Sequence, residues 1–248
     1  MNKLWLIARK DFSEAFRSRS TYVYIAVICV ITFVYYNNYN RFVAALVQQN
    51  ASAQTIFEQS RPVLSGLFNI LPVIDSMFVC SIFATYAVVL EKAKRNLESL
   101  MATPISLTRI WMGKTLGVTL PSVMIGLIVS IIGYAILNFV SVIPNTGSFI
   151  FPEPLAIVTA IIIVPILVFT IVSLVLYLQL VISNPRIANL VFFAIFFGLL
   201  VGLINLSSSG EAPNFSLIYL IVAAICAALS YIFSRSLTKE KVILSSKG

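Results

Sequence analysis

The sequence contains no histidine, and only 10% of its 248 residues are charged. The missing imidazole excludes histidine-dependent chemistry, such as a Ser–His nucleophile pair or a zinc-binding H-E-x-x-H helix. The three cysteines, Cys29, Cys80 and Cys226, stand far apart, with neither a disulfide framework nor a metal-ligand spacing. We therefore expect no catalytic residue and no metal or cofactor bound by this chain.

Charged residues make up about 25% of an ordinary soluble domain, whereas hydrophobic residues reach 59% here. The sequence therefore predicts an all-α, polytopic membrane protein. Six apolar segments approach or exceed the ~20 residues that a helix needs to cross a bilayer. They are residues 21–37, 66–90, 115–138, 155–182, 187–206 and 217–234. Between them, 38–65 is predicted as an outer segment with a short surface helix, and 141–154 as an outer loop of turns.

The basic residues are distributed unevenly between the two sides that these spans define. With the N-terminus inside, every lysine and arginine except Arg41 and Arg61 lies in an inner segment. Cytoplasmic loops of membrane proteins carry an excess of Lys and Arg. We therefore predict a multi-pass protein of the plasma membrane with both termini in the cytoplasm. The net charge of +8 follows from this asymmetry and from attraction to anionic membrane lipids, so no nucleic-acid binding is inferred.

The first 20 residues have the pattern of an amphipathic helix. Trp5, Phe12 and Phe16 fall on one side of such a helix with smaller apolar residues, and Arg17 falls on the other. An apolar face opposite a basic face is typical of a helix that lies in the membrane–water interface. Residues 1–20 are therefore predicted to form an interfacial helix on the inner leaflet, before the first span.

A charged island, residues 91–114, separates the second and third apolar segments. Apolar residues recur in it at helical spacing: Leu97, Leu100 and Met101. With Glu98 on the flank of this stripe, the pattern predicts a short amphipathic helix. Pro104 ends the helix because it lacks a backbone donor and disfavours a helical conformation of the preceding residue. Ser106 is then placed to cap a second helix that leads into the next span.

The order of residues in this island resembles the signature of the permease subunits of type-2 ABC transporters. The matching stretches are EK at 91–92, LESLMATPIS at 97–106 and GK at 113–114. The sequence departs from the family at 95–96, where RN replaces the usual Gly-Thr. In that family the loop carries a cytoplasmic coupling helix that docks into a separate ATPase subunit.

The resemblance implies the permease subunit of an ATP-driven ABC exporter. Two partner subunits would bind ATP and Mg²⁺, and a second permease copy or a related permease would complete the transporter. The residues that the resemblance assigns to ATPase coupling are Glu91, Leu97, Glu98, Leu100, Met101 and Pro104. The N-terminal segment is similar to the connecting helix of these permeases, which packs beside the ATPase.

Asp75 is the only acidic or basic residue inside a predicted span. A carboxyl group at such a depth indicates a place on a transport pathway. Hydration from an outer vestibule, or a hydrogen bond within the bundle, would explain it nearly as well. The alternative function is accordingly a self-contained channel or ion-coupled transporter centred on Asp75. The island at 91–114 favours the exporter, because a channel has no need for a cytoplasmic helix with this order of residues.

The stretch GKT at 113–115 has the ending of a phosphate-binding loop. Thr108 occupies the position of the leading glycine, however, and no strand precedes it. The chain is therefore not expected to be an enzyme, and Lys114 is expected at the level of the lipid headgroups. Residues 1–248 are predicted to form one transmembrane permease domain.

Overall fold

The computed structural model describes residues 3–17, 19–93, 105–182, 184–208 and 214–235, together with Thr238 and Val242. The helices are α1 (Lys3–Arg17), α2 (Arg19–Gln48), α3 (Ala53–Ala84), α4 (Leu90–Ala93), α6 (Leu107–Leu137), α7 (Ile143–Thr146), α8 (Pro154–Val158), α9 (Val164–Val181), α10 (Pro185–Ser208) and α11 (Phe215–Ser234). Three π-helical stretches join some of them into longer rods: η1 (Thr85–Val89), η2 (Asn138–Val142) and η3 (Thr159–Ile163). No strand occurs in the part of the chain that is described, which confirms the all-α prediction.

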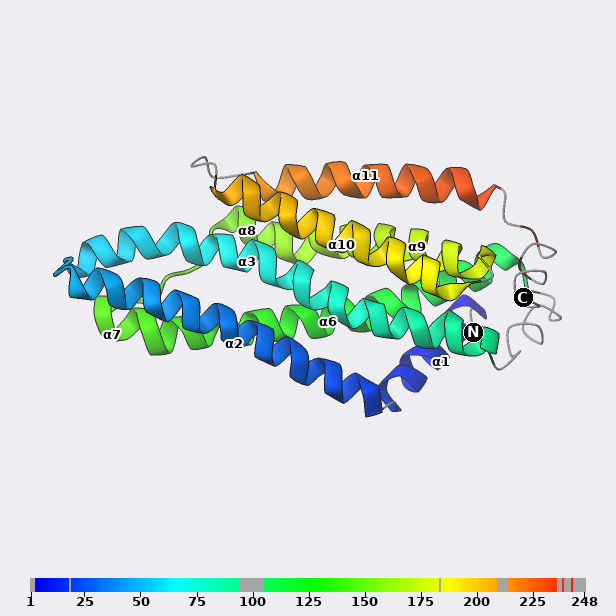
Figure 1. Cartoon of the computed structure of the whole chain (residues 1–248), viewed down its shortest axis with the longest axis horizontal. Helices are drawn as coiled ribbons and strands as arrows, with labels where there is room; N and C mark the ends of the chain where they lie inside the picture. Colours follow the sequence, from blue (N-terminus) through cyan, green and yellow to red (C-terminus); the bar gives the residue numbers. More distant parts are fainter. Residues whose placement is uncertain are drawn as a thin grey trace.

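Five helical rods are long and apolar enough to cross a membrane, and Figure 1 shows them side by side along the long axis. They are Thr21–Gln48, Ala53–Lys92, Leu107–Thr146, Pro154–Val181 and Phe215–Ser234. The sixth predicted span, 187–206, falls within α10, where the shorter stretch Asn189–Gly202 is apolar. All of α10 has 24 residues, or about 36 Å at 1.5 Å per residue. This length permits a sixth crossing, which stays a prediction.

The outer segment 38–65 differs from its prediction. Instead of a loop with a short surface helix, α2 continues to Gln48 and α3 begins at Ala53. The tight turn between them includes Asn50, whose φ of 56° lies in the left-handed region that Asn tolerates. The segment is rich in polar residues, which suggested a loop, but no glycine or proline interrupts 38–48. Helix therefore continues because nothing in the backbone ends it.

The predicted loop at 141–154 is likewise helical in its first part, since η2 and α7 prolong α6 to Thr146. Gly147 then ends the helix with a φ of 72°, a conformation that glycine adopts without steric cost. The side chain of Asn138 accepts a hydrogen bond from the Ile150 N–H (2.9 Å), and the Tyr134 hydroxyl donates to the Ile150 carbonyl (3.0 Å). The following loop is thus fastened to the helix that precedes it.

These longer helices produce a projection at one end of the molecule, where α2, α3 and α7 extend beyond α8 and α11 (Figure 1). The rod Leu107–Thr146 has 40 residues, or about 60 Å, against ~30 Å for the hydrocarbon core of a bilayer. The projection has its own apolar core, which includes Tyr39, Val43, Leu46, Ile56, Leu137, Val142 and Ile150. It is therefore a packed three-helix extension of the bundle and not a set of loops.

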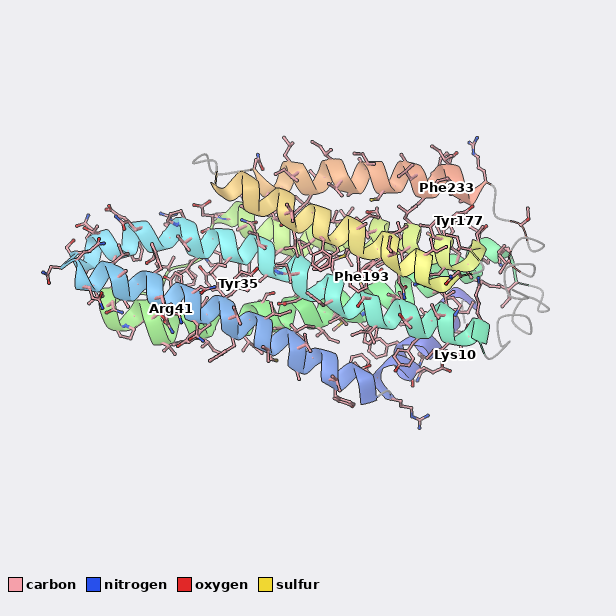
Figure 2. The ribbon with its side chains drawn as sticks, in the orientation of Figure 1. Lys10, Tyr35, Arg41, Tyr177, Phe193 and Phe233 are labelled. Atoms are coloured by element: carbon pink, nitrogen blue, oxygen red, sulfur yellow. The ribbon has the colours of Figure 1, made fainter. Side chains whose placement is uncertain are left out.

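The centre of the bundle is formed by α3 and α9, whose apolar residues are buried to the greatest extent. By contrast, α2 and α11 lie at the periphery and expose large apolar side chains such as Val30, Phe33 and Ile232. In a membrane such side chains face lipid. Figure 2 shows how α11 joins the centre: Phe233 stacks on Tyr177 of α9, with 5.4 Å between the ring centroids.

The contact between α3 and α6 depends on small residues. A Cβ atom built on Gly126 of α6 would lie 2.3 Å from Ser76 Oγ and 2.7 Å from the Ser76 backbone nitrogen of α3. Ser122 and Ser130 stand one turn to either side of Gly126 and are also buried. Small residues at four-residue intervals let two helices approach closely, which is the usual basis of helix association in membranes.

Candidate functional site: a buried charge cluster

The rod that begins with α3 ends in η1 and α4, immediately before residue 94. Glu91 lies in α4 and is 4% exposed, and Lys114, in the second turn of α6, is 1% exposed. Both residues lie near the end of a long apolar helical rod, and both charges are inside the bundle. A charged group removed from water is tolerated only when it is paired and hydrogen-bonded.

The hydrogen bonds of these two charges join four elements, α1, η1, α4 and α6. Glu91 Oε2 accepts from Lys114 Nζ at 2.6 Å, and Glu91 Oε1 accepts from Lys10 Nζ of α1 at 2.8 Å. Lys114 Nζ also donates to the Ala87 carbonyl of η1 at 2.6 Å. We call Lys10, Glu91 and Lys114 the charge cluster. Because both carboxylate oxygens of Glu91 are used, α1, α4 and α6 are held at one point.

The π-helical turn of η1 is part of this arrangement. A π-helical stretch accommodates an extra residue in one turn and changes the direction of its carbonyl groups, and such stretches recur at functional sites. Ala87 is the middle residue of η1, and its carbonyl is the one that Lys114 binds. The irregular turn thus supplies a backbone ligand to a buried ammonium group.

A further hydrogen bond connects the end of the rod Ala53–Lys92 to α9. Lys92 Nζ donates to the carbonyl of Ile182, the residue that ends α9, at 3.0 Å. A lysine at a helix C-terminus also interacts favourably with the negative end of the helix dipole. Together with the charge cluster, this bond joins the segment that leads into 94–104 to α1, α6 and α9.

The N-terminal helix packs against the bundle through a few residues. Ile7 and Ala8 are buried, and the Phe16 ring lies 5.8 Å from that of Phe83 in α3. Trp5 and Phe12 remain 51% and 41% exposed. Figure 2 shows Lys10 on α1 at the end of the molecule away from the projection. The helix prediction for 1–20 holds from Lys3 to Arg17, and its place in the membrane interface stays a prediction.

The family model of the ABC-2 family transporter proteins matches residues 5–240 of the chain. The chain belongs to the ABC-2 transporter family. It is accordingly an ABC-2 permease, a transport component of the membrane, and its apolar rods make it a multi-pass membrane protein. No curated protein matches it.

The structure places some of the predicted coupling residues of this ABC-2 permease and not others. Glu91 is at the centre of the charge cluster. Leu97, Glu98, Leu100, Met101 and Pro104 lie outside the described residues, so the coupling helix stays a prediction. The second helix of the island begins at Leu107, as expected, with Ser106 in the N-cap position. The Ser106 side chain makes no capping hydrogen bond, which corrects that detail.

Three residues of the site were missed from the sequence: Lys10, Lys92 and Lys114. Lys114 was expected at the headgroup level, but it is buried, because the carboxylate of Glu91 and the carbonyl of Ala87 accept hydrogen bonds from its ammonium group. A signal was present, since Glu91 and Lys114 are opposite charges at the two ends of one island. Recognising the pair required the packing of α4 against α6, which the sequence does not specify.

Asp75 lies in the α3–α6 contact and is fully buried. Its Oδ2 accepts a hydrogen bond from Ser130 Oγ at 3.0 Å, and its Oδ1 has no hydrogen-bond partner among the described residues. Asp75 does not line the cavity between α1 and α6, nor the cavity that includes Ser81 and Phe192, nor the one that includes Tyr36 and Ile136. The Ser130 bond is the hydrogen bond within the bundle that the sequence left open for Asp75. A place on a transport pathway stays a prediction.

We expect Asp75→Asn to leave the permease folded, because an amide oxygen can accept the Ser130 hydroxyl in the same place and the volume is unchanged. Transport should change only if the cargo or a coupling ion is cationic. Size-exclusion chromatography, thermal unfolding and transport of cationic and neutral cargo measure these effects, with Ser130→Ala as the control that removes the donor alone. Loss of transport for neutral cargo in a folded Asp75→Asn protein would contradict the structural role.

Proposed function

We propose that this permease is the membrane-spanning subunit of an ATP-driven exporter. Two partner subunits bind ATP and Mg²⁺ and hydrolyse the nucleotide, and a second copy of the chain or a related permease completes the transporter. The chain itself contributes no catalytic residue. The observation that carries the proposal is the set of bonds around Glu91 and Lys92, which join the rod entering 94–104 to three other helices.

The proposed mechanism follows from this connection. When ATP closes the partner subunits, the segment 94–104 moves with them through its apolar stripe, Leu97, Leu100 and Met101, and through the flanking Glu98. Glu91 is three residues before that segment and is bound to both α1 and α6. Displacement of the segment therefore pulls on α6, the rod that packs most extensively on α3, and changes the angle between these helices.

The proposed orientation places α1 and the charge cluster on the cytoplasmic side of the plasma membrane, with both termini inside and α10 as a sixth span. It is supported by the distribution of basic residues in the structure. Lys10, Lys92 and Lys114 lie at one end of the bundle. Figure 2 shows Arg41 near the opposite end, on the projection. An excess of basic residues on one side is the signal that orients membrane proteins.

Cysteine labelling tests this orientation. Ser52 and Ser106 are exposed and stand at opposite ends of the bundle. In a chain whose Cys29, Cys80 and Cys226 are replaced by alanine, a membrane-impermeant thiol reagent added to intact cells should label Ser52→Cys and spare Ser106→Cys. Permeabilised cells, in which both positions should react, are the control. Labelling of Ser106→Cys alone in intact cells would reverse the orientation.

The function itself is tested by reconstitution. The permease is expressed with an ABC ATPase subunit from its own genome, purified through a tag on the permease, and returned to vesicles. We expect the ATPase to co-purify and its hydrolysis rate to differ from that of the free subunit. A permease that conducts ions in vesicles without ATPase or nucleotide would instead support the channel or ion-coupled transporter.

A further inference from the structure

A groove with a volume of about 740 Å³ separates α1 from α6. This volume is within the roughly 300–1,000 Å³ typical of small-molecule sites. Its walls are mainly apolar. Aromatic rings come from α1 and aliphatic side chains from α6: Trp5, Phe12, Phe16, Leu116, Leu120 and Pro121. A long apolar group can therefore lie between the two helices.

The α1 wall also carries a line of polar groups. Arg9, Ser13 and Arg17 line the same groove and recur every four residues, which places them along one side of the helix. Both arginines are exposed, and neither forms an ion pair with a carboxylate in the part of the chain that is described. Lys10, on the neighbouring line, does pair with Glu14 and Glu91. The groove thus has two available guanidinium groups beside its apolar interior.

The α6 wall continues into the surface that faces lipid. Leu120 is 44% exposed, and Met124 and Ile128, one and two turns further along α6, are 58% and 53% exposed. An occupant of the groove can therefore extend from the arginines along α6 into the hydrocarbon layer. A molecule with an anionic head and a long apolar tail fits this path at both ends.

We propose that this groove binds one anionic phospholipid, with its phosphate at Arg9 and Arg17 and an acyl chain between α1 and α6. Guanidinium groups bind phosphate oxygens in a bidentate manner, and Ser13 can donate a further hydrogen bond. The bound lipid holds α1 against α6 on one side, while Lys10 is bound to Glu91 on the other. The lipid therefore stabilises the docked position of α1 from which the charge cluster operates.

The two tryptophans of the chain make the site measurable. Trp5 lines the groove and Trp111 is buried in the bundle, where its indole N–H donates to the Ser173 carbonyl at 2.9 Å. In Trp111→Phe, fluorescence reports on Trp5 alone. The protein is reconstituted in phosphatidylcholine nanodiscs containing a minority of brominated phosphatidylglycerol, and in matched discs with brominated phosphatidylcholine. Bromine quenches an indole only at close range.

We expect the phosphatidylglycerol to quench Trp5 at much lower mole fraction. Attraction of a basic residue to an anionic lipid is worth about fivefold in affinity, so two arginines give a preference of roughly 30-fold. Arg9→Gln/Arg17→Gln should remove the preference, whereas Arg109→Gln, which removes an exposed charge outside the groove, should keep it. Added salt should weaken the preference for phosphatidylglycerol in the protein that keeps both arginines, because salt screens the attraction between the charges. This test does not depend on whether the double arginine variant folds.

Equal quenching by the two brominated lipids would overturn the proposal, because the groove would then hold any lipid. Quenching by neither lipid would also overturn it, because no acyl chain would then lie beside Trp5 in the groove. Assignment of the lipid to the cytoplasmic leaflet rests on the proposed orientation. The binding measurement does not depend on that orientation, because nanodiscs expose both leaflets and contain no ATPase. A negative result would therefore count against the lipid site and not against the exporter proposal.

Discussion

Replacement of Leu100 by aspartate is expected to abolish co-purification of the permease with its ATPase. If Leu100 docks in a groove of the partner, the substitution removes a burial worth ~1.5–3 kcal/mol, or roughly 10- to 150-fold in affinity. It also places an unpaired carboxylate in a dry interface, which adds a further penalty. Pull-down through a tag on the permease and the rate of ATP hydrolysis in the complex measure the effect.

The matched control for this substitution is Ser99→Asp, which adds the same charge at the adjacent residue, off the apolar stripe. Membrane insertion of both variants should be normal, because the predicted spans do not include 91–114. Glu98→Ala should weaken coupling more mildly, since it removes one polar contact at the flank. A fully coupled Leu100→Asp complex would remove the docking proposal and restore the channel or ion-coupled transporter as the leading interpretation.

Replacement of Glu91 by leucine is expected to lower the stability of the permease itself. The substitution leaves the Lys114 ammonium group inside the bundle without its carboxylate. Loss of one partner of a buried ion pair costs about 3–5 kcal/mol. For a chain of this length the melting temperature should fall by on the order of 10 °C. Thermal unfolding of the purified protein measures the change, and Glu14→Leu, which removes an exposed carboxylate from the same α1 neighbourhood, should have little effect.

The double variant Glu91→Leu/Lys114→Met separates stability from coupling. Replacement of a whole buried pair by apolar residues is often neutral or stabilising, so the melting temperature should recover. If the pair transmits movement of the coupling segment, ATP-driven transport should stay low in this stable protein. Recovery of both properties would assign Glu91 and Lys114 to structural stability alone.

The long apolar runs and the placement of charges made the class of the protein predictable. Segments such as 155–182 and 217–234 contain no charged residue, and a helix is the simplest way to satisfy their backbone groups in lipid. The start of α6 at Leu107 was predictable from Ser106, which stands in the N-cap position although its side chain makes no capping bond. At 38–48 the sequence predicts a non-helical outer segment from its polar composition, whereas α2 continues to Gln48 because no glycine or proline ends it.

The order of residues in the island 91–114 by itself also indicated the family that the chain belongs to. Only the tertiary structure decided which charges meet. Lys10, Glu91 and Lys114 are 23 or more residues apart along the chain, and the sequence pattern describes each helix separately. Their pairing depends on the close approach of the helices, which small residues such as Gly126 permit, and on the π-helical turn that directs the Ala87 carbonyl to Lys114. Such contacts are properties of packed helices, and no local periodicity specifies them.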